Sequence, residues 1–366
     1  MFRVEMLPAA HGDALWIEVG PASKPRRILV DGGTAPTYAH IHSRITALDA
    51  NDRHFDLLVV THVDADHIEG IVRLLGDRQL GASFADIWFN GWRHLGAADT
   101  DTLGPVQGEI LSALIDEFGH PWNAAFGGGP VVLPAAGSPP TVDVNGLRLT
   151  VLSPGPEQLM KLRATWATEV RRAGLEPGVA KQALAKLAAT KKLQGLTLGE
   201  ERIAVRALAA AKTASDGAVA NGSSIALLAE FGEQRILLGA DAHPDVLAAG
   251  LDRLLIDRGL ETLAIDAFKL PHHASAANVT LDVLRLVRCP RFLVSTNGDV
   301  FNHPDPEAIA RVIVHGGGNP ELWFNYRSEE TLVWDDDALA SEHRYKAIFP
   351  HADDSGLALD LAPTEG

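Results

Sequence analysis

The sequence predicts an α/β fold in which two β-sheets stack face to face and helices cover their outer sides, an αββα sandwich. Two observations support this prediction. Short apolar runs rich in β-branched residues alternate with helical patterns in both halves of the 366-residue chain. Polar side chains that can bind metals follow directly on several of those runs, which is where open α/β sheets place their sites. Strands that alternate with helices are typical of sheets packed between helical layers.

The N-terminal half contains apolar runs that predict strands at 15–19, in a segment ending at Asp31, and at 55–61, 86–90 and 147–152. The Gly32-Gly33 pair after Asp31 permits a tight backbone path. Helical spacing of apolar residues predicts helices at about 38–50 and 105–118, and also from residue 67 onward. Gly- and Pro-rich stretches at 127–130 and 134–140 indicate loops.

The C-terminal half repeats the alternation. Strands are predicted at 224–230 and 235–238, joined by a hairpin turn over 231–234, and at 265–270, 291–296 and 321–325. Helices are predicted at 244–258, 279–287 and 305–314, and Asp305 and Pro306 supply the cap and the first residue of the last helix.

Residues 157–213 differ from both halves, because Ala, Leu, Lys, Gln and Glu dominate there. These strong helix formers predict two or three helices. Between 157 and 216 the chain carries eleven Lys or Arg and six Asp or Glu, a net charge of +5, which leaves −20 for the rest. We therefore predict two halves of one domain, at 1–155 and 221–366, separated by a helical insertion at 156–220. The insertion is either a basic lid or groove for a phosphate-rich substrate, or a solvated hairpin or dimerisation element.

The most informative segment runs from His62 to His67, with the sequence His-Val-Asp-Ala-Asp-His. It follows a buried strand and precedes a helix, so its four metal-capable side chains lie on a strand-to-helix loop. Imidazole and carboxylate together suit zinc or manganese, and carboxylates favour harder ions. Positions 62 and 64 can point the same way while 66 and 67 point apart, so one loop can serve two ions. The alternative is a solvated acidic loop with two incidental histidines.

Composition bounds the class of protein. The chain is 46% hydrophobic and has a formal net charge of −15, which indicates a soluble globular protein and argues against broad polyanion binding by the whole surface. No apolar run is long enough to span a membrane, and Glu5 interrupts what would be the core of a secretory signal. The single cysteine, Cys289, excludes an intramolecular disulfide. A reducing cytoplasm is the simplest interpretation.

The motifs resemble those of the metallo-β-lactamase superfamily in type and order. Motif two of that family is usually His-x-His-x-Asp-His, and the variant with Asp64 is typical of the branch that includes the soluble hydrolase domain of the competence protein ComEC. The other motifs that carry the resemblance are His11-Gly12-Asp13-Ala14, Ile28 to Gly33, Asn221 to Ser224, Ile236 to Asp241, Lys269 to Ser275, and Ser295 to Pro304. The chain departs from the family at Asp64, at the third motif, which lacks a histidine, and at Ala274, where glycine is usual.

The resemblance implies a four-layer αββα sandwich with two divalent metal ions, zinc or manganese. By matching positions, His62 and Asp64 hold one ion, while Asp66, His67 and one histidine of the His272-His273 pair hold the second, with Asp241 bridging. His272 is the first choice in that pair, and His273 then contacts substrate. Asp66 and His303 are the catalytic candidates; the alternative for His303 is a plain helix-entry residue. Asp31 is expected to support a ligand instead of binding directly. His11, Asn90 and His94 are further candidates for lining the site.

The leading hypothesis that the resemblance supports is a phosphodiesterase or nuclease that uses a metal-bridging hydroxide. Its partners would be a phosphodiester or another small hydrolysable substrate, with nucleic acid reached through the basic insertion and no membrane. An ester, lactone or other acyl hydrolase is the alternative enzyme, because fold does not settle function. A non-catalytic interaction module with a vestigial metal site is the alternative from another class. An oligomer is compatible with each of these hypotheses.

Overall fold

A computed structural model describes residues 1–95, 106–172, 203–352 and 355–362. Two mixed β-sheets lie face to face in it. The six-stranded sheet has the order β18-β1-β2-β3-β5-β7 and consists of β1 (Phe2–Met6), β2 (Leu15–Val19), β3 (Arg26–Val30), β5 (Leu57–Val59), β7 (Ile87–Trp88) and β18 (Leu357–Ala362). The eight-stranded sheet has the order β17-β16-β15-β13-β11-β10-β9-β8 and consists of β8 (Thr141–Val144), β9 (Leu147–Ser153), β10 (Ala226–Phe231), β11 (Gln234–Leu238), β13 (Ala267–Lys269), β15 (Arg291–Val294), β16 (Glu321–Phe324) and β17 (Lys346–Ile348).

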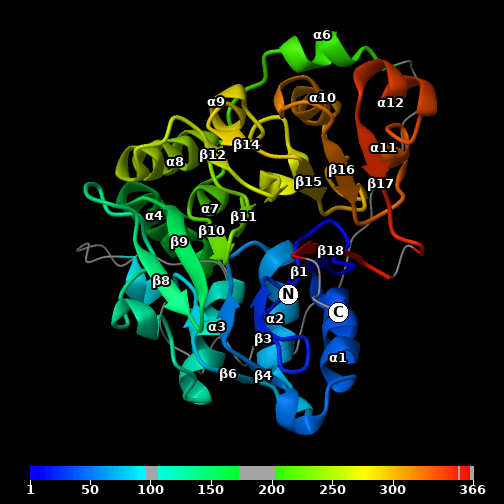
Figure 1. The fold of residues 1–366 in the computed structure, drawn as a ribbon. Coiled ribbons are helices and arrows are strands. Elements are labelled where there is room, and N and C mark those ends of the chain that lie inside the picture. The colour runs from blue at the N-terminus through cyan, green and yellow to red at the C-terminus, as the bar shows by residue number, and fades with distance from the viewer. Residues whose placement is uncertain (96–105, 173–202, 353–354, 363–366) are drawn as a thin grey trace.

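Helices cover the outer face of each sheet (Figure 1). The six-stranded sheet packs against α1 (Tyr38–Thr46), α2 (Ala65–Gly76) and α3 (Val106–Glu117). The eight-stranded sheet packs against α8 (Pro244–Arg258), α9 (Leu281–Leu284) and α10 (Pro306–His315). Shorter elements complete the described chain: the paired strands β4 (His54–Phe55) with β6 (Ser83–Phe84) and β12 (Leu263–Ala264) with β14 (Val287–Arg288), and the helices α7 (Val219–Gly222), α11 (Glu329–Leu332) and α12 (Asp337–His343).

Alternation along the strands explains the four layers. On β3, Ile28 and Val30 enter the core between the sheets while Leu29 faces the helices. On β11, Ile236 enters the same central core and Leu237 faces α8 and its neighbours. Side chains two apart share a face of a strand, so each sheet buries both of its faces. The predicted α/β class and the αββα layering are confirmed.

The helix-rich stretch after residue 155 is partly described. Helix α4 (Pro156–Arg172) packs Leu159, Leu162 and Trp166 into the core beneath α2 and α3. Helix α6 (Val205–Ala210) lies against α10. The predicted helices within 173–202 fall outside the described residues. The boundaries of the insertion stay a prediction, although its first helix shares the core of the N-terminal half.

Three predicted elements differ from the structure. The strand expected at 55–61 is divided into β4, which pairs with β6 in a small separate sheet, and β5, which pairs with β3 and β7. The helix expected at 279–287 ends at Leu284, since 287–288 pair with β12. The helix expected at 38–50 ends at Thr46.

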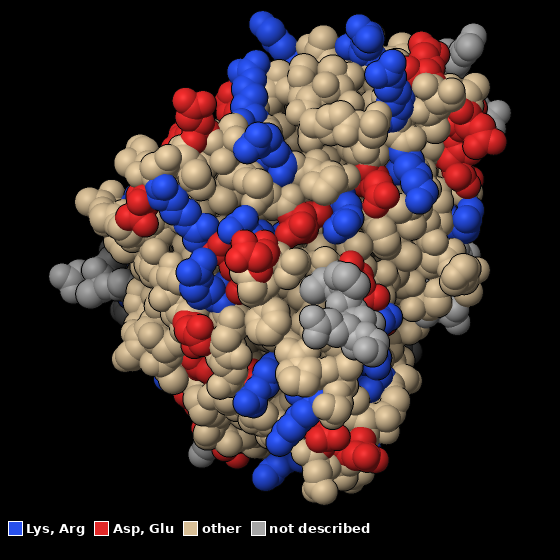
Figure 2. Space-filling model, in the orientation of Figure 1, with Lys and Arg blue, Asp and Glu red and all other residues tan. Residues whose placement is uncertain are grey.

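Charge is mixed over the face shown in Figure 2, where Lys and Arg side chains stand among Asp and Glu. Glu230 binds three arginines: its buried carboxylate accepts hydrogen bonds from Arg148, Arg235 and Arg258. None of the described helices is long and apolar enough to cross a membrane.

Candidate metal centre

The predicted ligands come from segments that follow parallel strands in both sheets. Asp31 follows β3, and the His62–His67 loop follows β5, which is its neighbour in the six-stranded sheet. Asp241 follows β11, and His272-His273 follows β13, which is its neighbour in the eight-stranded sheet. Parallel neighbours end at the same edge, so each sheet brings two segments to one place. The two edges meet, and the side chains converge between the sheets.

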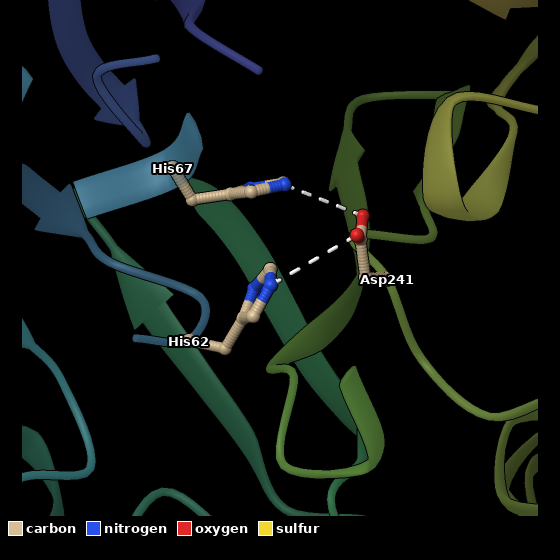
Figure 3. Close-up of side chains that lie close together, drawn as sticks. All are labelled: His62, His67 and Asp241. Carbon is tan, nitrogen blue, oxygen red and sulfur yellow. Dashed lines mark ion pairs between the residues drawn. The ribbon is translucent and has the colours of Figure 1, made fainter. Parts of the chain in front are cut away.

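Asp241 is the centre of the cluster and is only 3% exposed. Figure 3 shows the rings of His62 and His67 turned toward its carboxylate. His67 Nε2 lies 3.4 Å from Asp241 Oδ1, and His62 Nε2 lies 3.9 Å from Asp241 Oδ2. His272 Nε2 and His273 Nε2 each lie 3.8 Å from Asp241 Oδ2. Four imidazoles from two segments therefore approach one carboxylate.

The two aspartates of the loop add carboxylate oxygens beside two different imidazoles of the cluster. Asp66 Oδ2 lies 3.4 Å from His273 Nε2 and is mostly buried. Asp64 Oδ2 lies 3.5 Å from His62 Nε2, and its side chain is 42% exposed. Among the described residues, two sets of three side chains have ligand atoms close enough to share an ion: His62 with His67 and Asp241, and Asp66 with His67 and His273.

Each imidazole is held from behind through Nδ1. His67 Nδ1 donates to Asp31 Oδ2 at 2.8 Å, and His273 Nδ1 donates to the Ser295 carbonyl at 2.8 Å. Thr61 Oγ1 donates its one proton to Asp31 at 2.7 Å, so it accepts from His62 Nδ1 at 3.0 Å. With Nδ1 bonded outward, each ring turns Nε2 inward, and in a neutral ring that nitrogen carries the lone pair that a metal would take. Asp31 thus supports His67 from behind and does not face the cluster itself.

The backbone beside the ligands is held in a conformation that L-residues rarely adopt. Asp31 has φ 60°, and His272, His273 and Ala274 follow one another at φ 48°, 53° and 63°. Such residues cost of order 1–3 kcal/mol each and persist only where the surroundings fix them. The left-handed run turns both imidazoles toward Asp241 although they are adjacent in sequence. Ala274, at φ 63°, takes a conformation that glycine adopts without strain.

A buried ion pair lies under His273. Lys269 is fully buried and its Nζ donates to Asp13 Oδ2 at 2.5 Å. The other oxygen, Asp13 Oδ1, lies 3.4 Å from His273 Nδ1. Burial alone would raise the pKa of Asp13, but the charges of Lys269 and His273 outweigh it and hold the pKa below its usual range. Asp13 therefore links the lysine to a ligand candidate.

The cluster favours positive charge. Burial opposes the charged form of His67, but the carboxylates of Asp241 and Asp31 raise its pKa well above the ordinary value. Burial likewise opposes the charged form of Asp241, but His67 and His273 keep its pKa well below the usual range. An opposite charge within a few ångströms stabilises the charged form. Cations placed among these carboxylates are stabilised for the same reason.

Two features of the cluster suit divalent ions: buried atoms that lack hydrogen-bond partners, and the chemical type of its donors. His62 Nε2 and Asp241 Oδ1 are buried and have no hydrogen-bond partner among the described residues. Buried polar atoms are almost always paired, so two unpaired ones in the same cluster call for a ligand. Imidazole nitrogens with carboxylate oxygens are the donors that zinc and manganese take.

Some of the remaining predicted site residues lie near the cluster, and others do not. His273, not His272, belongs to the set with Asp66 and His67, while the assignment of His272 as the ligand there stays a prediction. His303 donates through Nδ1 to Asp305 Oδ1 at 3.1 Å, and its ring centroid lies 5.3 Å from that of His272. His11 lies near enough to Asp66 to be affected by its charge. Asn90 instead bonds to the backbone of Val131 and supports a loop.

Two residues that the sequence did not single out lie against His272. Asn278 Oδ1 accepts from His272 Nδ1 at 2.9 Å, and Asp216 Oδ2 lies 3.3 Å from the same nitrogen. Asp216 also lines a cavity with Gln158 and Lys161 of α4. Asp216 lies in the helix-rich stretch that carries no motif, so only the folded chain reveals its place.

His94 lies away from the metal cluster, packed on the ring of Trp122 at a centroid distance of 4.8 Å. Burial and the neighbouring Arg93 lower its pKa to about 4, from an ordinary 6.5.

The contribution of His94 to stability is present above pH 6.5 and is lost as the pH falls toward 4, because the unfolded chain takes up the proton first. We expect the wild type to lose about 2 kcal/mol between pH 7 and pH 5 that His94→Gln does not lose. Urea unfolding of both at the two pH values measures the difference, and equal losses would contradict it.

A scan of protein-family models finds no match to the sequence, and a search of curated proteins finds none either. Solved structures do match. The metallo-β-lactamase fold protein YhfI from Bacillus subtilis is 9% identical, with 98% of each chain covered and a TM-score of 0.39. Zinc-bound PqqB from Methylobacterium extorquens is 13% identical, with 98% of this chain and 100% of that chain covered and a TM-score of 0.38. A metallo-β-lactamase variant from Cronobacter sakazakii is 12% identical over 70% of each chain, with a TM-score of 0.30. The chemistry of the centre rests on this chain's own side chains.

Proposed function

We propose that the chain is a metal-dependent hydrolase with a two-ion centre, and that its substrate is a phosphodiester. The proposal of a metal rests on two imidazole nitrogens that lie very close together. His67 Nε2 and His273 Nε2 lie 3.3 Å apart, and both rings donate their Nδ1 proton outward, to Asp31 and to the Ser295 carbonyl. Two Nε2 lone pairs at that distance repel each other unless a proton or a metal cation lies between or beside them, and the buried carboxylate of Asp241, 3.4 Å and 3.8 Å from these two nitrogens, draws a cation to this place.

The ligand set supports two ions in place of one. Asp241 presents Oδ1 toward His67 and Oδ2 toward His62, so the carboxylate can bridge. Asp66 and Asp64 then add one oxygen on each side. Ions held by these residues would stabilise charge on a transferring group and would supply a water-derived nucleophile at neutral pH. The carboxylate-rich set is compatible with manganese as well as zinc, and two-metal sites recur in phosphatases and nucleases.

The chain's own residues hold and orient this arrangement. Asp31 fixes the ring of His67, and the Ser295 carbonyl fixes that of His273, so that each Nε2 points at the centre. His303 donates Nδ1–H to Asp305, which leaves its Nε2 free to carry a proton to the leaving oxygen. His303 is 9% exposed beside His272, where a substrate oxygen could reach it. Asp66, the other catalytic candidate, serves as a ligand and holds His273 in place.

The test is hydrolysis of bis(p-nitrophenyl) phosphate and single-stranded DNA beside a p-nitrophenyl ester and a lactone. Chelated wild-type protein is reloaded with manganese or zinc. We expect diester cleavage that depends on the added metal. His303→Gln should reduce cleavage of DNA about 100-fold or more, and of the nitrophenyl diester much less, because only the poor leaving group needs the proton.

Asp252→Ala, on the exposed side of α8, is the matched control and should cleave like wild type. Turnover of the ester or the lactone without diester cleavage would show that the substrate is an acyl compound and not a phosphodiester. Silence on all substrates from protein that binds two ions would overturn the hydrolase proposal and favour an interaction module. Equal effects of His303→Gln on both diesters would remove the proton-donor role from His303.

A further inference from the structure

For one of the two proposed ions, the sequence motifs supply only two ligands. The first site has His62 and Asp64, and the third-motif segment at 221–224 supplies no histidine. Asn221 lies there instead, and its Nδ2 donates to Asp216 Oδ2 at 2.8 Å. The side chain that would complete this ion has to come from elsewhere in the chain.

His272 has the same arrangement as the other three imidazoles. Its Nδ1 is bonded outward and its Nε2 lies 3.8 Å from Asp241 Oδ2. His62 Nε2 approaches the same oxygen at 3.9 Å and His273 Nε2 at 3.8 Å, whereas Asp241 Oδ1 faces His67. His273 also forms a set with Asp66 and His67, to which His272 does not belong, so His272 is the imidazole left beside His62 at this oxygen.

The Nδ1 proton of His272 is fixed by a buried network. Asn278 Nδ2 donates to Asp216 Oδ2 at 3.0 Å and to the Ala242 carbonyl at 3.1 Å, which leaves Asn278 Oδ1 to accept from His272 at 2.9 Å. Asp216, with a side chain only 7% exposed, lies 3.3 Å from the same Nδ1. Its other oxygen accepts the backbone N–H of Ala218 at 2.8 Å, so the carboxylate cannot swing away.

We propose that His272 is the missing ligand of the ion held by His62 and Asp64, and that Asp216 is the positioning residue that fixes its ring. The assignment rests on the proposed two-ion centre. It divides the His272-His273 pair between the two ions, His273 going to the ion of Asp66 and His67. It also makes the stretch after α6 part of the metal centre, because Asp216 reaches the site from there. A carboxylate behind a ligating imidazole fixes its tautomer and raises its basicity.

Calorimetric titration of chelated full-length protein with zinc or manganese alone tests this. Wild type and the surface control His315→Ala should bind two ions. His272→Ala, Asp64→Ala and His273→Ala should each bind one. Paired variants decide which ion is lost: Asp64→Ala/His272→Ala should still bind one, since both changes empty the same site, whereas His272→Ala/His273→Ala should bind none.

Asp216→Asn should weaken one ion by about 10–100-fold and leave the other unchanged, and Asp216→Ala should weaken the same ion more. Circular dichroism checks that each variant is folded. Two ions bound with wild-type affinity by His272→Ala, or none by Asp64→Ala/His272→Ala, would overturn the assignment, as would fewer than two ions in the wild type. Two ions bound by a wild type that hydrolyses nothing would overturn the proposed function and leave this assignment standing.

Discussion

Replacement of Asp241 by alanine is expected to remove both ions and, with them, hydrolysis. Among the residues that the structure describes, this carboxylate lies 3.4–3.9 Å from all four imidazoles. Losing only an outer partner of a ligand costs about 10–100-fold in affinity or activity, so losing a bridging ligand should cost more than about 100-fold. Metal analysis of the purified variant and its diester turnover measure the two effects. The exposed Asp252→Ala on α8 is the control for a lost aspartate.

The same variant separates binding from folding. Ions that bind only the folded chain raise its unfolding free energy, by about 2.7 kcal/mol at a concentration 100 times the dissociation constant. Wild type should therefore gain stability on adding zinc or manganese, whereas Asp241→Ala should not. Retention of either ion at wild-type affinity by Asp241→Ala would show that the carboxylate does not bridge.

Replacement of Lys269 by methionine is expected to destabilise the fold by about 3–5 kcal/mol at neutral pH, because Asp13 would remain buried without its counter-charge. Lys269 is 0% and Asp13 is 3% exposed in their side chains. The paired change Lys269→Met/Asp13→Asn removes both charges and should recover part of the loss. Urea unfolding in the presence of chelator measures this without the contribution of metals, and Lys346→Met on the exposed edge of β17 is the control.

The effect of Lys269→Met should depend on pH in a fixed direction. In the wild type the pKa of Asp13 is lowered from an ordinary 3.8, so its stabilising contribution is present above that value and is lost as the pH falls below it. In the variant Asp13 becomes protonated more readily. The difference between the two proteins should therefore shrink on acidification, and a difference that is constant or grows would contradict the ion-pair explanation.

The sequence predicts well those features that depend on residues close together in the chain. The αββα layering follows from alternating strands such as β3 and β11, and the His62–His67 loop is recognisable because its donors are contiguous. The hairpin of β10 and β11 forms as expected, with Glu230 opposite Arg235.

The features that sequence could not predict depend on distant parts of the chain. Lys269 and Asp13 are 256 residues apart, and Asn278 and Asp216 are 62 apart. Strand β18 pairs with β1 across nearly the whole chain. The choice between His272 and His273 is set by three consecutive left-handed residues, a backbone path that no periodicity indicates. Asp216 resembles any polar residue of a helix-rich stretch until the fold places it behind His272.

Anomalous scattering from crystals grown with zinc or manganese tests most directly whether two ions lie on either side of Asp241. We expect two peaks about 3.5–4 Å apart, one beside Asp66, His67 and His273 and the other beside His62, Asp64 and His272. A single peak, or peaks that do not contact Asp241, would contradict the two-ion centre.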